Sequence, residues 1–396
     1  MSKNQTEVVV LSATRTAIGT FGGVLKAVSA GDLGAAVVRE AIRRSTLPAS
    51  EMQHAVFGNV IHTVPRDMYI SRVATENGGM PIESPAMTVN RLCGSGLQAI
   101  VSAAQLIMLG DVETAVAGGI ESMSNAPYWS MGTRWGQRMN DAKLVDAMTA
   151  ALHDPFNNCH MGVTAENVAK KWNISREDQD ALAAESHKRA GNAIANGHFK
   201  SQITPIEIKS RKETIVFDTD EHVRPNTTAA DLAKLKPVFD PQGTVTAGNA
   251  SGINDGAAAL VLASAEYAKR KGIKPIARLV GYGHAAVEPL LMGIGPVPST
   301  QKVFARTGLG VKDIDVFEVN EAFAAQALAV SRELGLPADR TNPNGSGIGL
   351  GHPVGATGAI ITVKALYELE RIGGRYALIT MCIGGGQGIS AIFERL

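Results

Sequence analysis

The chain has 396 residues, of which 45% are hydrophobic and 19% are charged, and its formal net charge is +1. This length predicts two or three domains with sizeable cores, and the balanced charge excludes the strongly basic class of nucleic-acid-binding proteins and gives no sign of a membrane partner. Three widely spaced cysteines, Cys93, Cys159 and Cys382, fit neither a disulfide framework nor a structural zinc site, so a reducing compartment is expected.

The N-terminal residues are polar and lead directly into the apolar run Val8–Leu11. We therefore expect no signal or transit segment, no apolar run long enough to span a bilayer, and a cytoplasmic protein. The pattern predicts a buried strand at Val8–Leu11, a helix at Asp32–Arg44 and a second strand at Ala55–Gly58. Strands that alternate with helices predict βαβ units and a parallel sheet, which places the fold in the α/β class.

The next stretch, Ala86–Gly96, carries the first candidate functional residue. Met87–Val89 is predicted to end a short buried strand and Leu97–Leu109 to form an apolar helix, so Cys93 lies where the strand passes to the helix N-terminus. A helix N-terminus favours the thiolate and lowers the pKa of a thiol, which makes Cys93 a candidate nucleophile. The alternative is a small apolar filler, because free cysteines are often buried and inert.

Several positions recur in the second half of the chain at a constant separation of 262 residues. The matched pairs are Leu47 and Leu309, Gly96 and Gly358, and Ala115 and Ala377 (309 − 47, 358 − 96 and 377 − 115). Each half also presents the same order of strand, helix, connector and strand. A constant offset predicts that one α/β unit has been duplicated.

The offset breaks between Glu121 and Gly248. The strand Gly256–Leu262 resembles a strand that begins at Gly388, only 132 residues later (388 − 256) instead of 262. The first copy therefore carries about 130 additional residues (262 − 132) before this strand. The insertion contains a polar helix that begins with the capping-box pattern Ser175–Asp178. We divide the chain into residues 1–121 with 249–272, an inserted segment of residues 122–248, and residues 273–396. Such an excursion usually builds a binding wall or a lid.

Three further stretches follow predicted strands of the second half. Asn320 comes directly after the strand Val316–Val319, where it either caps the next helix or serves chemistry. His352 lies in the glycine-rich loop Asn344–Gly358, and an imidazole in such a turn before a helix is a candidate base. Cys382 ends a strand before another glycine loop. Together these motifs place two thiols, an imidazole and an amide at strand ends, which face the active crevice in doubly wound sheets.

In combination, these blocks resemble the thiolase family of acyl-CoA C-acyltransferases over essentially the whole chain. The blocks are Val89–Gly96, Asn320–Phe323, Gly351–Pro353 and Cys382–Gly386, with Met161–Glu166 and Ala247–Gly252 in the insertion. The resemblance implies two duplicated five-stranded α/β domains in a five-layered αβαβα core, with an inserted loop domain that binds CoA. The Leu-Cys-Gly-Ser-Gly form is similar to the bacterial biosynthetic or short-chain 3-ketothiolase branch.

The resemblance also implies a reaction, the reversible Claisen condensation or thiolysis between acetyl-CoA and a short acyl-CoA. Cys93 would carry the acyl group, with His352 taking its proton, and Cys382 would remove or return the α-proton of acetyl-CoA. His352 and a water on Asn320 would hold the enolate oxygen, and the N–H groups of Cys93 and Gly384 would hold the tetrahedral oxyanion. A thioester α-carbon is a weak acid, so the base needs such stabilisation.

The same resemblance makes CoA and acyl-CoA substrates, with no permanently bound cofactor and no metal. Arg224 would lie near the adenine and phosphate end of CoA. The residues expected along the pantetheine path and at the acyl pocket are Leu152, His160, Met161, Phe239, Ala247, Ser251, Phe323 and Met292. The alternative for the apolar members of this set is core packing.

Cys159 matches no block of the family and is interpreted as structural. The family implies a role in fatty acid metabolism and a homotetramer, a dimer of dimers, with its tetramer contact at the loop Trp129–Met139, which carries Arg134 and Arg138. Neither nucleic acid nor a membrane is an expected partner. Preferred chain length and physiological direction stay open, as does the choice between dimer and tetramer.

Two other functions stay open at this point. A decarboxylating 3-ketoacyl synthase of the same superfamily would be expected to have a second histidine in place of Asn320 and no need of Cys382. A non-catalytic acyl-CoA-binding protein would not need Cys93, His352 and Cys382 to be intact together.

Overall fold

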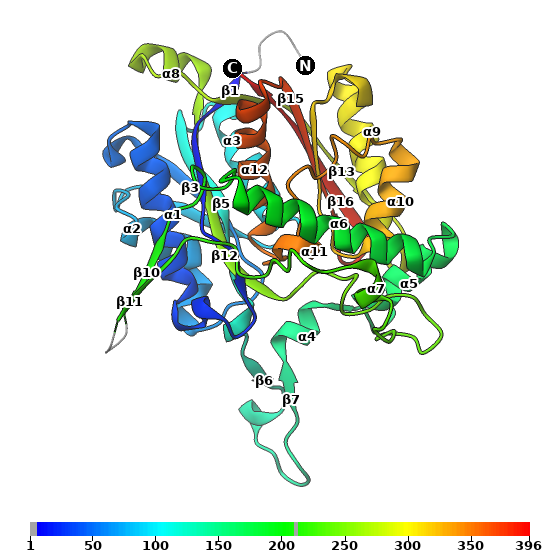
Figure 1. The fold of residues 1–396 in the computed structure, drawn as a ribbon. Coiled ribbons are helices and arrows are strands. Elements are labelled where there is room, and N and C mark those ends of the chain that lie inside the picture. Colours follow the sequence, from blue (N-terminus) through cyan, green and yellow to red (C-terminus); the bar gives the residue numbers. More distant parts are fainter. Residues whose placement is uncertain (1–5, 210–212) are drawn as a thin grey trace.

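The computed structural model describes residues 6–209 and 213–396. Ten strands of this described chain form one central sheet, and each half of the chain contributes its own part (Figure 1). The first half contributes β1 (Val8–Arg15), β3 (His54–Gly58), β4 (Ala86–Val89), β5 (Thr114–Ser122) and β12 (Asn254–Ser264), and the short β2 (Gly19–Thr20) pairs with β12. The second half contributes β13 (Ala277–Ala286), β14 (Val316–Val319), β15 (Tyr376–Ile383) and β16 (Gln387–Arg395).

The two parts of the sheet repeat one strand order. In the first half the order is β4-β3-β5-β12-β1, and in the second half it is β14-β15-β16-β13. β3 runs parallel to both β4 and β5, and β14 runs parallel to β15, whereas the remaining neighbours are antiparallel in both halves. An isolated parallel bridge from Phe317 to Thr341 occupies the position of β4. The parts join where Val9 and Val10 of β1 pair with β13.

The duplication predicted from the sequence is confirmed by the element boundaries. β3 and β14, α3 (Ser95–Leu109) and α12 (Thr357–Ile372), and β5 and β15 each begin 262 residues apart (316 − 54, 357 − 95 and 376 − 114). Sequence and topology therefore repeat together, as expected of a duplicated unit.

Five layers result, because α3 and α12 pack together between the two parts of the sheet (Figure 1). Glycines allow this close approach: a Cβ on Gly96 would lie 2.7 Å from the Ala359 nitrogen, and one on Gly358 would lie 2.4 Å from the Leu97 nitrogen. The remaining layers are helical. They contain α1 (Ala30–Ser45) and α2 (Ile70–Asn77) on one side, and α9 (Pro296–Thr307) and α10 (Ala324–Leu334) on the other.

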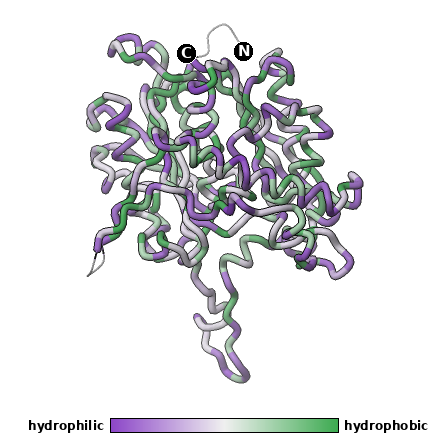
Figure 2. Tube along the Cα trace, viewed as in Figure 1, coloured by the Kyte–Doolittle hydropathy of each residue, from purple (hydrophilic) through white to green (hydrophobic). Residues whose placement is uncertain are grey.

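The hydrophobic core follows these inner layers. β5 and β12 are buried along their whole length, and Figure 2 shows apolar stretches through the centre and hydrophilic segments on the outer helices and loops. By length and composition, Leu92–Leu109 is long and apolar enough to cross a membrane, whereas we expected no apolar run of that length from the sequence. Because 61% of this segment is buried inside the molecule, it serves as a core helix here.

The inserted segment 122–248 spreads over both halves. Its helices are α4 (Ala147–Ala151), α5 (Met161–Lys171), α6 (Arg176–Ala195) and α7 (Ala229–Leu232), and its strands are β6 (Tyr128–Ser130), β7 (Leu144–Asp146), β8 (His153–Asp154), β9 (Cys159–His160), β10 (Ile206–Lys209) and β11 (Thr214–Phe217). α5 and α6 pack on α10, and α6 also contacts α11 (Gly347–Leu350). The Ser175 hydroxyl accepts from the Asp178 N–H, so the predicted cap of α6 is confirmed. The proposed domain boundaries stay a prediction.

Two features complete the fold. α8 (Ala265–Lys271) follows β12, and β6 and β7 form an arm that projects from the body (Figure 1). The prediction that Met87–Val89 ends a buried strand is wrong about burial, because β4 is only half-buried and Met87 is 40% exposed. The strand lies at the edge of the sheet, where one side has no neighbour to cover it.

Candidate active site

A strained turn carries Cys93 to the entrance of α3. Leu92 adopts a left-handed conformation, with φ of 45°, which is costly for a residue with a branched side chain. The Ser95 hydroxyl holds the turn, since it accepts from the Arg91 N–H at 2.9 Å and donates to the Leu92 carbonyl at 2.7 Å. The turn leaves Cys93 half-buried, two residues before the helix begins.

A hydrogen-bond chain sets the orientation of His352. Its backbone N–H donates to Asn254 Oδ1 at 2.9 Å, and its Nδ1 lies 2.6 Å from Thr357 Oγ1. The single proton of the Thr357 hydroxyl goes to the Pro353 carbonyl at 2.9 Å, so Oγ1 accepts from Nδ1–H. These hydrogen bonds place the ring proton of His352 on Nδ1. Nε2 therefore keeps a lone pair with which it can accept a proton as a general base.

Asn320 lies beside that lone pair. Its Nδ2 is 3.4 Å from His352 Nε2, and its Oδ1 is buried without a hydrogen-bond partner among the described residues. The alternative that Asn320 caps the next helix is wrong, because α10 begins at Ala324 with Phe323 in the cap position. The amide therefore belongs to the cluster around His352.

Cys382 lies at the end of β15 and is fully buried, in contact with an apolar cluster that includes Met292 and Phe323. The following glycine turn brings the Gly384 N–H to the Cys93 thiol, which also receives its own backbone N–H. Gly385 and Gly386 take φ of 77° and 82°, a conformation that favours glycine, so this turn depends on its sequence.

Burial sets the protonation of the three titratable groups. It raises the pKa of the Cys93 thiol to about 11, against the opposing effect of the Gly384 N–H, and lowers the pKa of His352 to about 4. It also raises the pKa of Cys382 well above its usual range. The predicted lowering of the Cys93 pKa at a helix N-terminus is therefore wrong for the free protein, because desolvation outweighs the dipole. A neutral thiol beside a neutral imidazole requires proton transfer before attack.

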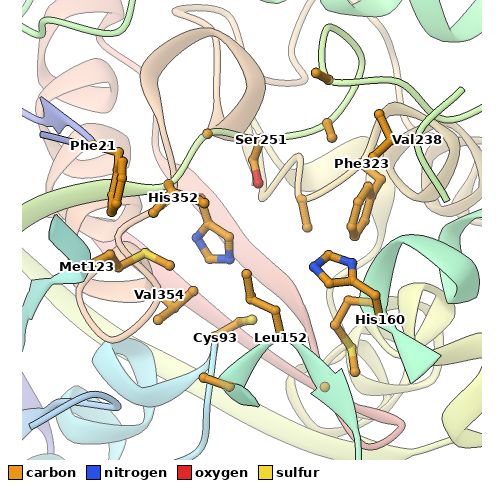
Figure 3. A pocket seen from close by; sticks show the side chains of 18 of the residues that line it. Phe21, Cys93, Met123, Leu152, His160, Val238, Ser251, Phe323, His352 and Val354 are labelled. Atoms are coloured by element: carbon orange, nitrogen blue, oxygen red, sulfur yellow. The ribbon is translucent and has the colours of Figure 1, made fainter. Parts of the chain in front are cut away.

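These groups open into a cavity of about 510 Å³ (Figure 3). Cys93, His352 and Gly384 line it, whereas Cys382 and Asn320 lie outside its lining. All nine residues expected to contact CoA or the acyl group line the cavity: Leu152, His160, Met161, Arg224, Phe239, Ala247, Ser251, Met292 and Phe323. Cys159 does not line it and is half-buried in β9.

One aromatic contact and one hydrogen bond from a backbone N–H shape the part of the cavity that the insertion lines. The ring of His160 stacks on Phe239, with centroids 4.6 Å apart and planes 14° apart. His160 Nδ1 accepts from the Gly162 N–H at 3.0 Å, which leaves the ring proton on Nε2. The wall thus combines an apolar surface with one directed donor.

Arg224 lies next to two imidazoles. Its backbone N–H donates to His187 Nδ1 at 3.2 Å, and the rings of His187 and His222 stack with centroids 6.0 Å apart. Burial lowers the pKa of both rings, to about 4 for His187. Both are therefore neutral at pH 7, and the guanidinium is the positive group at this end of the cavity.

Sequence reasoning missed several residues that line the cavity. They are Phe21, Val60 and Leu92 of the first half, Met123 and His222 of the insertion, and Val354 of the second half, among others. His222 stands two residues from Arg224, a signal that could have found it. Leu92 lies in the block Val89–Gly96, next to Cys93. The others occupy loops and element ends without a motif, so only the tertiary structure brings them to the cavity.

The fold and site define an acyl-transfer enzyme with a thiol nucleophile. The family models described as the thiolase N-terminal domain and the thiolase C-terminal domain match residues 8–266 and 273–395. The chain therefore belongs to the thiolase family, whose members catalyse condensation and thiolysis of acyl-CoA thioesters.

Similar proteins agree with this assignment. The chain is 64% identical to the beta-ketothiolase BktB of Cupriavidus necator over 391 residues, covering 98% of the chain and 99% of that protein. It is 49% identical to the acetyl-CoA acetyltransferase of Pseudomonas aeruginosa, with coverage of 98% and 99%.

Solved structures give the same result. The acetyl-CoA acetyltransferase of Bacillus anthracis superposes with a TM-score of 0.97 at 46% identity and covers 100% of both chains. The human mitochondrial 3-ketoacyl-CoA thiolase in complex with CoA gives a TM-score of 0.96 at 43% identity, with coverage of 99% and 98%. The predicted fold class is confirmed.

Proposed function

We propose that the protein catalyses reversible acyl transfer between acetyl-CoA and a short acyl-CoA, with an acyl group carried on Cys93. The observation that carries this proposal is the convergence on one cavity of the Cys93 thiol, the Gly384 N–H and the Nε2 lone pair of His352. In the first step Cys93 Sγ attacks the thioester carbonyl, His352 Nε2 takes the thiol proton, and CoA leaves with a proton.

In condensation, the Cys382 thiol passes its proton to His352 Nε2, and the resulting thiolate removes an α-proton from the second acetyl-CoA. The carbanion attacks the acyl carbon on Cys93, the Cys93 thioester bond breaks as the new carbon–carbon bond forms, and the departing Cys93 thiolate takes the proton from His352. His352, protonated on Nε2, and the Asn320 amide stabilise the enolate oxygen. The N–H groups of Cys93 and Gly384 stabilise the tetrahedral oxyanion, the kind of donor whose loss costs about 10²–10³-fold in rate.

CoA binds as a substrate along the wall formed by the inserted segment. The Arg224 guanidinium suits the phosphates, because it is the positive group at that end of the cavity. Ser251 and the stacked His160–Phe239 pair suit the polar and apolar parts of pantetheine. No group of three or more His, Cys, Asp or Glu in the described residues could hold a metal ion. That the protein has no resident cofactor stays a prediction.

The rival readings fit less well. A decarboxylating synthase would leave the buried Cys382 thiol without a task and would place a histidine where Asn320 stands. A binding protein would not need a strained turn at Leu92 or an oriented imidazole at His352.

The acyl carrier is tested by mass spectrometry. Incubation with acetyl-CoA should add an acetyl group to the peptide that contains Cys93, and acetoacetyl-CoA with CoA should yield acetyl-CoA. Label on Cys159 or Cys382 with Cys93 unmodified would contradict the assignment.

The division of labour is tested by Cys382→Ser, because a hydroxyl is a far weaker base than a thiol at neutral pH. Acyl exchange between acetyl-CoA and labelled CoA needs only Cys93, His352 and the oxyanion donors, so it should survive in good part. Exchange of acetyl α-protons with deuterated solvent should fall by on the order of 10³-fold. Equal losses in both rates would reassign Cys382 to support of the acyl site.

We further propose a cytoplasmic homotetramer that acts in fatty acid metabolism. The projecting β6–β7 arm, with Trp129 48% and Trp135 91% exposed, supports the tetramer, because exposed apolar groups mark interaction sites. Composition and cysteine usage support the cytoplasm.

A further inference from the structure

Two separate apolar clusters meet the reaction centre, one at each thiol. Cys93 and Leu152 pack against a cluster of Ile61, Met123, Ala147 and Val354, here called the Cys93 cluster. Cys382 belongs to a cluster with Met161, Met292 and Phe323, here called the Cys382 cluster. In Figure 3, Met123 and Val354 lie on one side of Cys93 and His352, and Phe323 lies on the other.

The proposed reaction gives the two sides different tasks, and this step rests on the proposed function. In thiolysis of a 3-ketoacyl-CoA, the bond between the α-carbon and the β-carbonyl breaks. The β-carbonyl and its alkyl chain stay on Cys93 Sγ, while the α-carbon takes a proton from Cys382 and leaves as acetyl-CoA. The alkyl chain therefore extends from Cys93, and any substituent on the α-carbon lies toward Cys382.

We infer that the Cys93 cluster, and Met123 above all, sets the length of the acyl chain that the enzyme accepts. Met123 and Val354 are 1% and 4% exposed, so the chain finds no open path to solvent beyond them. Met123 lines the cavity and begins the short 3₁₀ helix Met123–Asn125 directly after β5, a backbone position that cannot retreat without moving the sheet.

Behind this cluster lies a second cavity of about 360 Å³, which shares part of the wall. Ile61 and Ala147 belong to the cluster and line the second cavity, and Val60 and Ala151 line both cavities. Small apolar side chains thus separate the two cavities. Shortening a side chain on this wall adds room for a longer alkyl chain, and the added room is apolar.

The experiment compares thiolysis of acetoacetyl-CoA (C4) with that of 3-ketooctanoyl-CoA (C8) in the full chain. Met123→Ala should raise the C8 to C4 ratio of kcat/KM by about fifteen-fold, since two more buried methylenes contribute about four-fold each. Met123→Leu, which nearly conserves volume, should stay within about two-fold of the unaltered protein.

Met292→Ala is the opposing variant, because the resemblance placed Met292 at the acyl pocket, whereas the chemistry above places it beside the α-carbon, in the Cys382 cluster. It should therefore change the C8 to C4 ratio less than Met123→Ala does, and raise the use of 2-methylacetoacetyl-CoA relative to acetoacetyl-CoA. Should Met123→Ala not fold, Val354→Ala shortens the same cluster from another residue, with the same expected rise. A C8 to C4 ratio that responds to Met292→Ala and not to the Cys93-cluster variants would overturn the inference. No acetoacetyl-CoA thiolysis by the unaltered protein would instead refute the proposed function.

Discussion

At the scale of single residues, burial makes both partners of the first step neutral. The Cys93 pKa is raised to about 11 and the His352 pKa is lowered to about 4, so neither group is charged at pH 7 in the free protein. Each shift has the same cause, which is the loss of solvation of the charged form. Activation therefore depends on the orientation of His352, since no standing thiolate exists to attack.

A pH profile tests this state. Because the Cys93 pKa lies above 9, the thiolate fraction at neutral pH is small and grows about ten-fold per pH unit. The rate constant for alkylation of Cys93 by iodoacetamide should therefore climb continuously from pH 6 to pH 9, with the modified peptide identified by mass spectrometry. A rate constant that already reaches a plateau at pH 7 would show that the Cys93 pKa is lowered, as the position at a helix N-terminus predicted.

Thr357 holds the tautomer on which the base depends. Thr357→Val removes the acceptor of Nδ1–H, so the proton can move to Nε2, and acyl exchange should fall by about 10²-fold or more, as when a catalytic imidazole takes the wrong tautomer. Thr357→Ser should recover most of the rate. Thr362→Val on the same helix removes a buried hydroxyl that donates only to the Gly358 carbonyl, and should change acyl exchange by less than about two-fold.

At the scale of elements, one buried carboxyl group ties together the segments that carry the site. Glu121 lies near the end of β5 and accepts from the Ile61 N–H at 3.1 Å, the Val60 N–H at 3.1 Å and the Gly355 N–H at 2.8 Å, with Asn59 Nδ2 at 3.2 Å. Burial nevertheless raises the pKa of Glu121 to about 8. Gly355 belongs to the turn between His352 and α12, and Val60 lines the cavity. The Glu121 carboxyl group thus connects the His352 turn to the wall beside Cys93.

Glu121→Gln keeps the size of this group and replaces one acceptor oxygen by a donor. The His352 turn should shift, so the acyl-exchange rate should fall about ten-fold when it is normalised to the amount of Cys93 that iodoacetamide can alkylate. The KM for acetyl-CoA should stay within about two-fold. Asp315→Asn is the control, because Asp315 accepts two backbone N–H groups at the opposite end of β15. Equal losses in the two variants would assign Glu121 to general stability alone.

At the scale of the whole molecule, duplication builds the site and the insertion supplies its cover. Cys93 follows β4 of the first half, whereas Asn320 and His352 follow β14 and α11 of the second half and Cys382 lies near the end of β15. Contact between α3 and α12 at Gly96 and Gly358 brings the halves together. One copy therefore presents the proposed nucleophile, and the other presents the proposed base, the amide and the second thiol.

The projecting arm offers a test of assembly. Trp129→Ser with Trp135→Ser removes two exposed aromatic groups from β6 and the loop after it, and should convert tetramers to dimers in light scattering at micromolar concentration. Leu109→Ser removes an exposed leucine at the end of α3, 77% exposed, and should leave the mass unaltered. Tetramers that persist in the double variant would place the contact elsewhere.

The sequence alone determined the duplicated α/β fold and the motif residues, and both are local properties of the chain. A constant offset of 262 residues and the motifs at Cys93, Asn320, His352 and Cys382 can be recognised without knowing what packs against them. The same holds for the Ser175 cap of α6, which depends on a residue three positions away.

The tertiary structure decided what depends on distant neighbours. It reversed the pKa shift of Cys93, because desolvation comes from residues far apart in the chain and outweighs the nearby helix N-terminus. It placed β4 at an exposed edge, since strand order is a property of the assembled sheet. It also brought Phe21, Met123 and Val354 to the cavity, and no local pattern marks these residues, because a pocket wall is defined by what it faces.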